Sequence, residues 1–278
     1  MISTSFNYTK ANSIEEALNA IDDDSKILAG GHSLIPALKL RLNQTERLID
    51  ISTINELKGI SFDGNDLVIG AGATHAEIAE SDLAREHAAL FCIVAGQIGD
   101  IQVRNRGTIG GSIAHADPAA DWPAALLACD ATIEVQSRSG KRSISAADFF
   151  IGIFTTALQS DELITGVRVS SKAGHLCAYQ KFAQPASRFA LVGCAICASG
   201  SKDQLSNVRV AFTGVSDTPY RDQSVEAALE GKAITKETRA AAAGALDKSV
   251  YVMSDHFASE VYRAHLASVM LTRAMDAL

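Results

Sequence analysis

The sequence predicts an α+β fold with more than one domain. Its N-terminal part alternates strand, helix and strand, whereas its C-terminal part carries a run of strand-like segments followed by a run of helical ones. A length of 278 residues fits about two domains and suffices to bury a full core. The 47% of hydrophobic and 21% of charged residues are ordinary for a globular protein.

Charge and hydropathy argue against two classes of function. The 25 Lys and Arg residues are outnumbered by 32 Asp and Glu residues, and the basic residues form no stripe, so a nucleic-acid binder is not expected. No apolar run approaches the roughly 18 residues that a membrane span needs, and the N-terminal residues lack a secretory signal. We expect a cytoplasmic protein whose five scattered cysteines are reduced core thiols.

The first fifty residues are predicted to form a small β-α-β-like unit, which a hairpin and helices follow. Ser13-Ile-Glu-Glu16 is a capping-box pattern that opens a helix to about Ile21. Asp63-Gly64 supplies the turn of a hairpin, because glycine there tolerates a positive φ. The expected strands are residues 26–29, 47–51, 60–62 and 67–69, and the expected helices are residues 33–42, 74–79 and 83–97. Residues 99–121 show neither the helical nor the strand periodicity of apolar residues, and such a long irregular run is usually functional.

The C-terminal half separates strands from helices. A helix over residues 123–129 precedes a hairpin around Ser139-Gly140, and residues 170–174 are the best candidate for a domain boundary. The remaining strands are expected at residues 132–136, 141–144, 163–169, 176–182, 190–198 and 207–215, and the remaining helices at residues 224–230, 235–246 and 256–275.

Two glycine-rich segments favour an anionic ligand. Ala29-Gly-Gly-His-Ser33 joins a strand to a helix, where successive backbone N–H groups can bind an anion, although an ordinary tight turn explains the segment equally well. Thr108-Ile-Gly-Gly-Ser112 adds a second pair of glycines flanked by hydroxyls. Together the two segments indicate a ligand with two phosphates more strongly than either does alone.

Other motifs are weaker. Gly70-Ala-Gly-Ala-Thr-His75 fails the dinucleotide-binding fingerprint, because a histidine replaces the third glycine. Cys194-Ala-Ile-Cys197 has metal-ligand spacing, but residues three apart in a strand point to opposite faces, so no metal site is predicted. His115-Ala-Asp117 is not predicted to be part of a catalytic triad, because the sequence has no nucleophile-elbow motif. Arg104-Asn-Arg106 fits a phosphate contact and a solvated loop equally well.

Several ordered motifs resemble one family over nearly the whole chain. They are residues 29–42, residues 102–112 running into residues 114–121, Asp148-Phe-Phe150, and the C-terminal residues 260–274. In these segments the sequence resembles the FAD-binding medium subunit of molybdenum hydroxylases, the carbon monoxide dehydrogenase and xanthine dehydrogenase family. The resemblance implies a vanillyl-alcohol-oxidase (PCMH)-type FAD-binding fold with subdomains at residues 1–57 and 58–174, followed by a small α+β domain at residues 175–278.

The resemblance also implies the residues that hold FAD. The two glycine segments would bind the pyrophosphate from opposite sides, and Asp121 would bond a polar part of FAD such as a sugar hydroxyl. Ile98 and Gly99 would line the adenosine end, while Lys181 and Phe189 would lie near the flavin. The implied cofactor-binding residues are Ala29, Gly30, Gly31, His32, Ser33, Leu34, Ile98, Gly99, Thr108, Gly110, Gly111, Ser112, Ala114, His115, Asp121, Lys181 and Phe189.

Two of these residues depart from the family pattern. Ser112 stands where many relatives carry Asn. Phe189 stands where the counterpart in the carbon monoxide enzyme resembles a Tyr. Either change could alter the flavin potential or the choice of electron acceptor.

The implied function is electron transfer. A small partner with [2Fe–2S] clusters and a large partner with the molybdenum cofactor would complete a dimer of heterotrimers, and this chain would pass electrons through FAD to an external acceptor. A stand-alone FAD-dependent reductase or oxidase of the same fold is the alternative. It would need an acid or base, for which His32, His75 and His115 are candidates. A flavin-free scaffold subunit is disfavoured because both glycine segments are retained.

Overall fold

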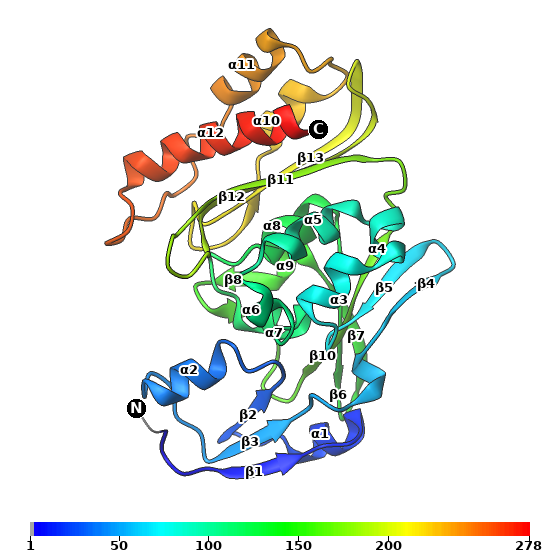
Figure 1. Cartoon of the computed structure of the whole chain (residues 1–278), viewed down its shortest axis with the longest axis vertical. Coiled ribbons are helices and arrows are strands. Elements are labelled where there is room, and N and C mark those ends of the chain that lie inside the picture. The colour runs from blue at the N-terminus through cyan, green and yellow to red at the C-terminus, as the bar shows by residue number, and fades with distance from the viewer. Residues whose placement is uncertain (1–2) are drawn as a thin grey trace.

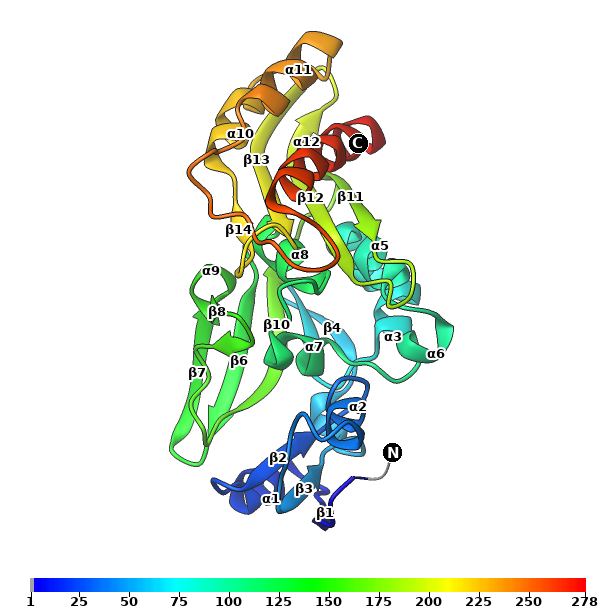
Figure 2. The same cartoon turned by 90° about the vertical axis from the view of Figure 1, so that its left-hand side faces the viewer.

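The computed structural model describes residues 3–278. Its three larger sheets follow one another along the long axis of the molecule (Figure 1), and a fourth sheet is a two-stranded hairpin. The N-terminal unit lies at one end, the five-stranded sheet with its helices lies in the middle, and the third sheet with the C-terminal helices lies at the other end (Figure 2). This arrangement confirms the α+β class. The predicted boundaries after residues 57 and 174 stay predictions.

The N-terminal unit is a parallel three-stranded sheet in the order β1-β3-β2. Its elements are β1 (Asn7–Lys10), α1 (Ile14–Ala20), β2 (Ser25–Leu28), α2 (Leu34–Lys39) and β3 (Arg47–Asp50), followed by the 3-10 turn η1 (Asn55–Leu57). Ser13 caps α1 by accepting a hydrogen bond from the N–H of Glu16, as the capping-box pattern predicts. The sequence analysis did not predict β1, whose four residues are all exposed, so no alternation of apolar side chains marks it.

The middle unit is an antiparallel sheet in the order β4-β5-β10-β6-β7. Its strands are β4 (Ile60–Asp63), β5 (Asp66–Gly70), β6 (Thr132–Ser137), β7 (Gly140–Ser145) and β10 (Leu163–Ser170), with a separate small hairpin of β8 (Phe150–Gly152) and β9 (Thr155–Thr156). Its helices are α3 (His75–Glu80), α4 (Asp82–His87), α5 (Ala89–Gln97), α6 (Ile101–Arg104), α7 (Ile109–His115), α8 (Trp122–Ala128) and α9 (Ala146–Phe149).

The expectation that residues 99–121 are irregular is wrong, because this stretch contains α6 and α7. Asp100 caps α6 by accepting hydrogen bonds from the N–H groups of Gln102 and Val103, and Thr108 caps α7. Gly110 and Gly111 lie inside α7, where their low helix propensity hid the helix from sequence reasoning. Tertiary contacts, described below, hold these glycines in place.

The C-terminal unit is an antiparallel sheet in the order β11-β12-β13-β14 with three helices on one face. Its elements are β11 (Leu176–Ala183), β12 (Ala190–Ser201), β13 (Gln204–Thr213), β14 (Tyr220–Arg221), α10 (Gln223–Leu229), α11 (Lys236–Gly244) and α12 (Glu260–Ala277). In β12, Cys194 and Ile196 belong to the core under these helices, whereas Ala195 and Cys197 belong to the core of the middle unit. Because both faces of β12 are buried, it reads as a continuous apolar run.

Within residues 3–278, no helix is both long and apolar enough to cross a membrane.

Candidate functional site

The first glycine loop, residues 29–34, leaves β2 and enters α2 with five successive backbone N–H groups that have no acceptor among the described residues, those of residues 30–34. Gly31 has a φ of 77°, which favours glycine. Ser33 makes no side-chain cap to α2, so it does not occupy these donors. Because buried or half-buried N–H groups normally find acceptors, a run of unpaired ones suits an anionic ligand.

The second glycine loop, residues 108–112, lies directly against the first. A Cβ on Gly30 would lie 1.9 Å from the carbonyl oxygen of Arg106, and a Cβ on Gly111 would lie 3.8 Å from the Cβ of Ala29. Gly30 is therefore needed for the close approach of the two segments. The structure thus brings together the two loops that the sequence analysis paired.

The backbone of the second glycine loop is already bonded within the protein. The N–H of Gly110 donates to the carbonyl of Ala71 at 2.9 Å, and the N–H of Gly111 donates to Oγ1 of Thr108 at 3.1 Å. The N–H of Ser112 donates to the carbonyl of Thr108 at 3.0 Å. These amides are not free for a ligand, so the hydroxyls of Thr108 and Ser112 are the donors that this loop can offer.

The two glycines of the second loop also serve different purposes. A Cβ on Gly110 would lie 2.6 Å from the Cβ of Ala71, so this glycine allows α7 to pack against the end of β5. Gly111 is exposed, and its added Cβ would meet only Oγ1 of Thr108 at 2.9 Å and the side chain of Ala29. Only Gly111 therefore faces the space in front of the first glycine loop.

His75 supports the second loop from the core. It is buried, and its Nδ1 accepts a hydrogen bond from Nε1 of Trp122 at 3.2 Å. Burial lowers the pKa of His75 to about 4, with the charges of His32 and Arg104 acting in the same direction. His75 is thus a neutral structural residue, which makes it a poor acid or base for a stand-alone enzyme.

The other two histidines lie at the surface of the same region. Nε2 of His32 is 3.3 Å from the carbonyl oxygen of Gln102, which joins the first glycine loop to α6. The ring of His115 packs at 5.0 Å from the ring of Phe154, and Ala114 beside it in α7 is exposed. Neither histidine is paired with a carboxylate from residues 3–278, so the structure gives neither the setting of a catalytic base.

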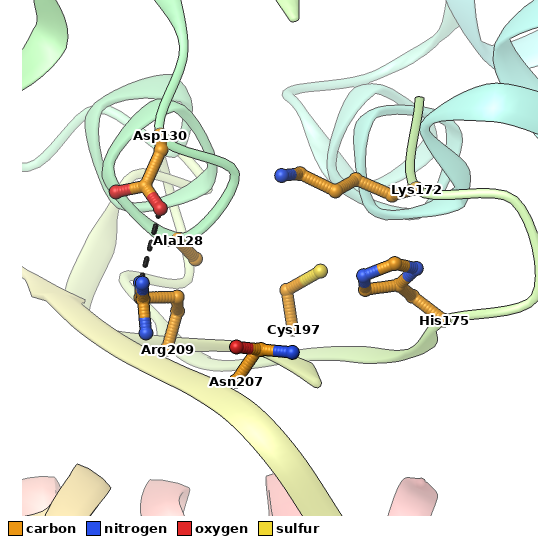
Figure 3. Close-up of a pocket in the computed structure, with 7 residues that line it drawn as sticks. All are labelled: Ala128, Asp130, Lys172, His175, Cys197, Asn207 and Arg209. Atoms are coloured by element: carbon orange, nitrogen blue, oxygen red, sulfur yellow. Dashed lines mark hydrogen bonds and ion pairs between the residues drawn. The ribbon is translucent and has the colours of Figure 1, made fainter. Parts of the chain in front are cut away.

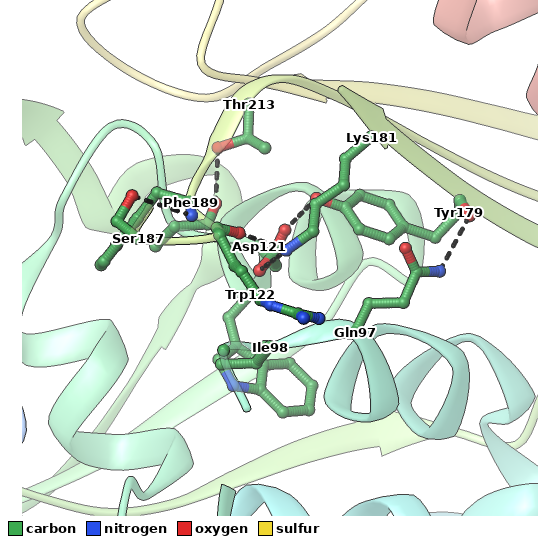
Figure 4. Close-up of polar contacts among 12 residues, drawn as sticks. Gln97, Ile98, Asp121, Trp122, Tyr179, Lys181, Ser187, Phe189 and Thr213 are labelled. Carbon is green, nitrogen blue, oxygen red and sulfur yellow. Dashed lines mark hydrogen bonds and ion pairs between the residues drawn. The ribbon is translucent and has the colours of Figure 1, made fainter. Parts of the chain in front are cut away.

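Asp121 is the centre of a buried polar cluster (Figure 4). Nζ of Lys181 donates to Oδ2 of Asp121 at 2.8 Å, and the hydroxyl of Tyr179 donates to Oδ1. Burial raises the pKa of Asp121, while the charge of Lys181 and the hydrogen bonds from Lys181 and Tyr179 oppose the rise. Burial also raises the pKa of Tyr179 well above its ordinary value. The cluster is therefore a neutralised ion pair with a protonated phenol.

The cluster fixes the orientation of Lys181. Its ammonium group also donates to the carbonyl of Arg188 at 2.8 Å, so two acceptors hold it in place. The backbone before Asp121 is fixed as well, because Oγ1 of Thr213 donates to the carbonyl of Ala120 at 2.6 Å. Lys181 thus joins the middle unit to the turn between β11 and β12.

A cleft of about 450 Å³ opens beside Lys181. It is lined by Gly96, Gln97, Gly99, Lys181, Ala183, Gln184, Pro185 and Arg188. Ile98 lies in the segment between Gln97 and Gly99, and Phe189 is 39% exposed in the turn that ends at β12. The structure therefore brings the predicted Gly99 and Lys181 to one cleft, although they are far apart in the sequence.

Sequence reasoning missed three residues of this region. Tyr179 bonds Asp121, Gln97 donates from Nε2 to the carbonyl of Tyr179 at 3.2 Å, and Arg188 lines the cleft. Tyr179 could have been found, because it lies two residues before Lys181 and so shares its face of the strand. No local pattern marks Gln97 or Arg188.

Among residues 3–278, no group of three or more His, Cys, Asp or Glu side chains could hold a metal ion. The free amides of the first glycine loop and the hydroxyls of the second instead suit the pyrophosphate of FAD.

Two family models cover most of the chain. Residues 4–172 match the FAD binding domain in molybdopterin dehydrogenase, and residues 177–278 match the CO dehydrogenase flavoprotein C-terminal domain. The chain is 38% identical to the carbon monoxide dehydrogenase medium chain of Hydrogenophaga pseudoflava, over 100% of this chain and 98% of that one. It is 36% identical to the glyceraldehyde dehydrogenase medium chain of Sulfolobus acidocaldarius, over 97% and 96%.

Solved structures agree with these matches. The chain superimposes with a TM-score of 0.94 and 40% identity on a chain of the carbon monoxide dehydrogenase from Hydrogenophaga pseudoflava that lacks the Mo-pyranopterin moiety of the molybdenum cofactor, covering 100% of this chain and 98% of that one. A chain of quinoline 2-oxidoreductase from Pseudomonas putida 86 gives a TM-score of 0.94 at 30% identity, with the same coverage. The protein therefore belongs to the FAD-binding medium subunits of the molybdenum hydroxylases and is an FAD-containing oxidoreductase subunit.

Proposed function

We propose that this chain is the electron outlet of a molybdenum hydroxylase. It accepts electrons from [2Fe–2S] clusters in a small partner subunit and delivers them through FAD to an external acceptor. A large partner subunit holds the molybdenum cofactor and oxidises the substrate, and two heterotrimers form the complete enzyme. The relatives support this division of labour, since they are named as medium chains of carbon monoxide and glyceraldehyde dehydrogenases.

The observation that carries the proposal is the run of unpaired N–H groups at residues 30–34. Two phosphate groups in one ligand accept hydrogen bonds from these donors, and the hydroxyl of Ser112 approaches from the facing loop. Gly111 leaves room for the pyrophosphate because it has no side chain. Bound FAD supplies the redox chemistry, and the residues of this chain bind it and orient it.

We assign the cleft that Gly99 and Lys181 share to the flavin end of the cofactor, with Ile98 and Phe189 beside it. Ile98 and Gly99 therefore do not line the adenosine end, which the family resemblance implied for them. Lys181 keeps a fixed position because Asp121 and the carbonyl of Arg188 both accept from its ammonium group. Because Asp121 neutralises its charge, Lys181 would act on the flavin through the remaining N–H donor of its ammonium group. Asp121 acts on FAD through Lys181 and through its remaining acceptor capacity.

The test is FAD binding by the purified chain and by Gly111→Val. The valine side chain fills the space that the pyrophosphate needs, so we expect FAD affinity to fall by at least about 100-fold, equivalent to about 2.7 kcal/mol. Quenching of flavin fluorescence measures the dissociation constant, and circular dichroism reports the fold. Gly244→Val is the matched control, because Gly244 is exposed in α11 with nothing within 4 Å of an added Cβ.

Two results would overturn parts of the proposal. If Gly111→Val bound FAD with wild-type affinity, the placement of the pyrophosphate beside the second glycine loop would be wrong. Hydroxylation of a substrate by the isolated yellow chain would instead identify a stand-alone flavoenzyme. Purification from the native source with flavin, molybdenum, iron and two additional chains would support the assignment of partners.

A further inference from the structure

Three of the five cysteines meet between the middle and C-terminal units. Cys177 on β11 and Cys197 on β12 are register partners, and their Sγ atoms are 3.3 Å apart. Cys129, which ends α8, is the second thiol that bonds the Cys197 sulfur. Cys194 lies on the opposite face of β12, in the core under the C-terminal helices. The cluster is thus built by tertiary contact, and sequence spacing does not reveal it.

A pocket of about 250 Å³ opens at Cys197 (Figure 3). The sulfur points into the pocket between the side chains of Lys172 and His175. Arg209 also lines the pocket, and its Nε is 3.0 Å from Oδ2 of Asp130. Cys197 as a whole is only 2% exposed, so the pocket is the route by which a small reagent would reach its sulfur.

The surroundings favour the thiolate of Cys197 over those of its neighbours. Hydrogen bonds from Cys129 and then Cys177 lower the pKa of Cys197, and the charges of His175 and Lys172 add to the effect against burial. The hydrogen bond to Cys197 and burial raise the pKa of Cys177. Since the thiolate is the nucleophile in cysteine chemistry, Cys197 is the sulfur that reacts first.

We propose that Cys197 is a peroxide-reactive thiol and that Cys177 is its resolving partner. The Cys197 thiolate attacks one oxygen of hydrogen peroxide, the O–O bond breaks, and the departing hydroxide takes up a proton to give water. Cys197 is then a sulfenic acid. The Cys177 sulfur attacks it, the S–S bond forms, the S–O bond breaks, and a second water leaves. Two thiols lose two electrons and two protons, and peroxide is reduced to two waters.

The strand geometry permits this bond. Directly opposed residues of antiparallel strands have Cα atoms about 4.5 to 5.5 Å apart, which lies within the range of about 4.4 to 6.8 Å found for disulfides. The two sulfurs already face each other at 3.3 Å, so side-chain rotation with a small strand adjustment closes the bond. Oxidation at this place would cross-link β11, which also carries Tyr179 and Lys181.

The experiment treats the reduced full-length chain with hydrogen peroxide and maps the products by mass spectrometry without reduction. We expect a disulfide between Cys177 and Cys197 in the wild-type chain. In the double variant Cys129→Ser/Cys177→Ser, which lacks both thiols beside Cys197, the sulfenic acid at Cys197 should persist and be trapped by dimedone. Cys194→Ser is the matched control on the same strand, and it should form the disulfide as the wild type does.

The rates give a second readout. Because an ionised thiol reacts faster than one whose pKa is raised by burial, Cys197 should react more than about tenfold faster than Cys194. Equal rates at both cysteines, or a disulfide that omits Cys197, would overturn the proposal. A disulfide between Cys129 and Cys197 would overturn the assignment of Cys177. The wild-type measurement needs no variant, so poor folding of a variant leaves the proposal open to refutation.

Discussion

The two glycine loops look alike in the sequence but differ in the fold. The first, residues 29–34, leaves five successive amides without acceptors in the part of the chain that the structure describes. In the second, residues 108–112, the amides of Gly110, Gly111 and Ser112 are bonded to Ala71 and Thr108. The segment that follows ends in Asp121, and both oxygens of its carboxylate accept from neighbours. The same pair of glycines therefore leaves amides unpaired in one loop, whereas in the other loop the amides are paired and Gly110 serves close packing.

The largest expected effect tests whether Asp121, at the end of the segment after the second glycine loop, depends on its protein partner Lys181 for stability. Lys181→Met removes the cation that neutralises Asp121, whose side chain is 5% exposed. Breaking a buried ion pair from one side costs about 3 to 5 kcal/mol of unfolding free energy, because an unpaired charge remains. Urea denaturation of the FAD-free chain measures this loss. Lys248→Met, at an exposed lysine, should show none.

The pH dependence of this loss has a definite sign. Without Lys181, the folded-state pKa of Asp121 rises further above its unfolded value, so the variant loses stability as the pH rises through that folded pKa. The deficit relative to the wild type should be largest at high pH and shrink on acidification. A deficit that grows on acidification would mean that Asp121 does not depend on Lys181.

The next largest effect is the pH dependence of stability that His75, which supports the second glycine loop, should cause. The pKa of His75 falls from 6.5 to about 4 in the fold, so the unfolded chain binds a proton that the folded chain does not. Stability from neutral His75 is present above pH 6.5 and is lost as the pH falls toward 4, by up to about 3 kcal/mol. His75→Asn keeps an acceptor near Nδ1 but does not titrate, so its stability should change less over this window. Identical pH profiles for the two proteins would contradict the assignment.

The smallest effect separates two neighbouring glycines. Gly110→Ala places a Cβ 2.6 Å from the Cβ of Ala71 and should cost about 1 to 3 kcal/mol through overpacking. Gly111→Ala meets only the Thr108 hydroxyl and Ala29, so the FAD-free chain should stay within about 1 kcal/mol of wild type. Thermal unfolding of both variants without FAD makes the comparison. Equal losses would show that both glycines are packing residues.

Local patterns predicted most elements of the fold. Ser13 caps its helix as the sequence indicates, and the hairpin around Gly64 has the positive φ that its turn requires. The helix expected over residues 83–97 is broken at Ala88, which starts α5 with a φ of −153°. Residues 99–121 were misread because two glycines lie inside α7, where caps and packing against Ala71 outweigh propensity.

The candidate site was predictable only where its residues are close in sequence. Both glycine loops were identified from their own residues, and the family resemblance added Asp121 and Lys181. That resemblance could not reveal that Tyr179 and Lys181 occupy both oxygens of Asp121, or that Gln97 bonds the strand carrying Tyr179. These contacts join residues 60 or more positions apart in most cases, so no local pattern encodes them.

The sequence by itself determined the α+β class, the glycine loops and the family, because caps, turns and ordered motifs act over a few neighbouring residues. Only the tertiary structure decided which loop keeps its amides free, which carboxylate holds Lys181, and which cysteines meet. These depend on how separate segments pack, since hydrogen-bond partners and desolvation are set by neighbours in space.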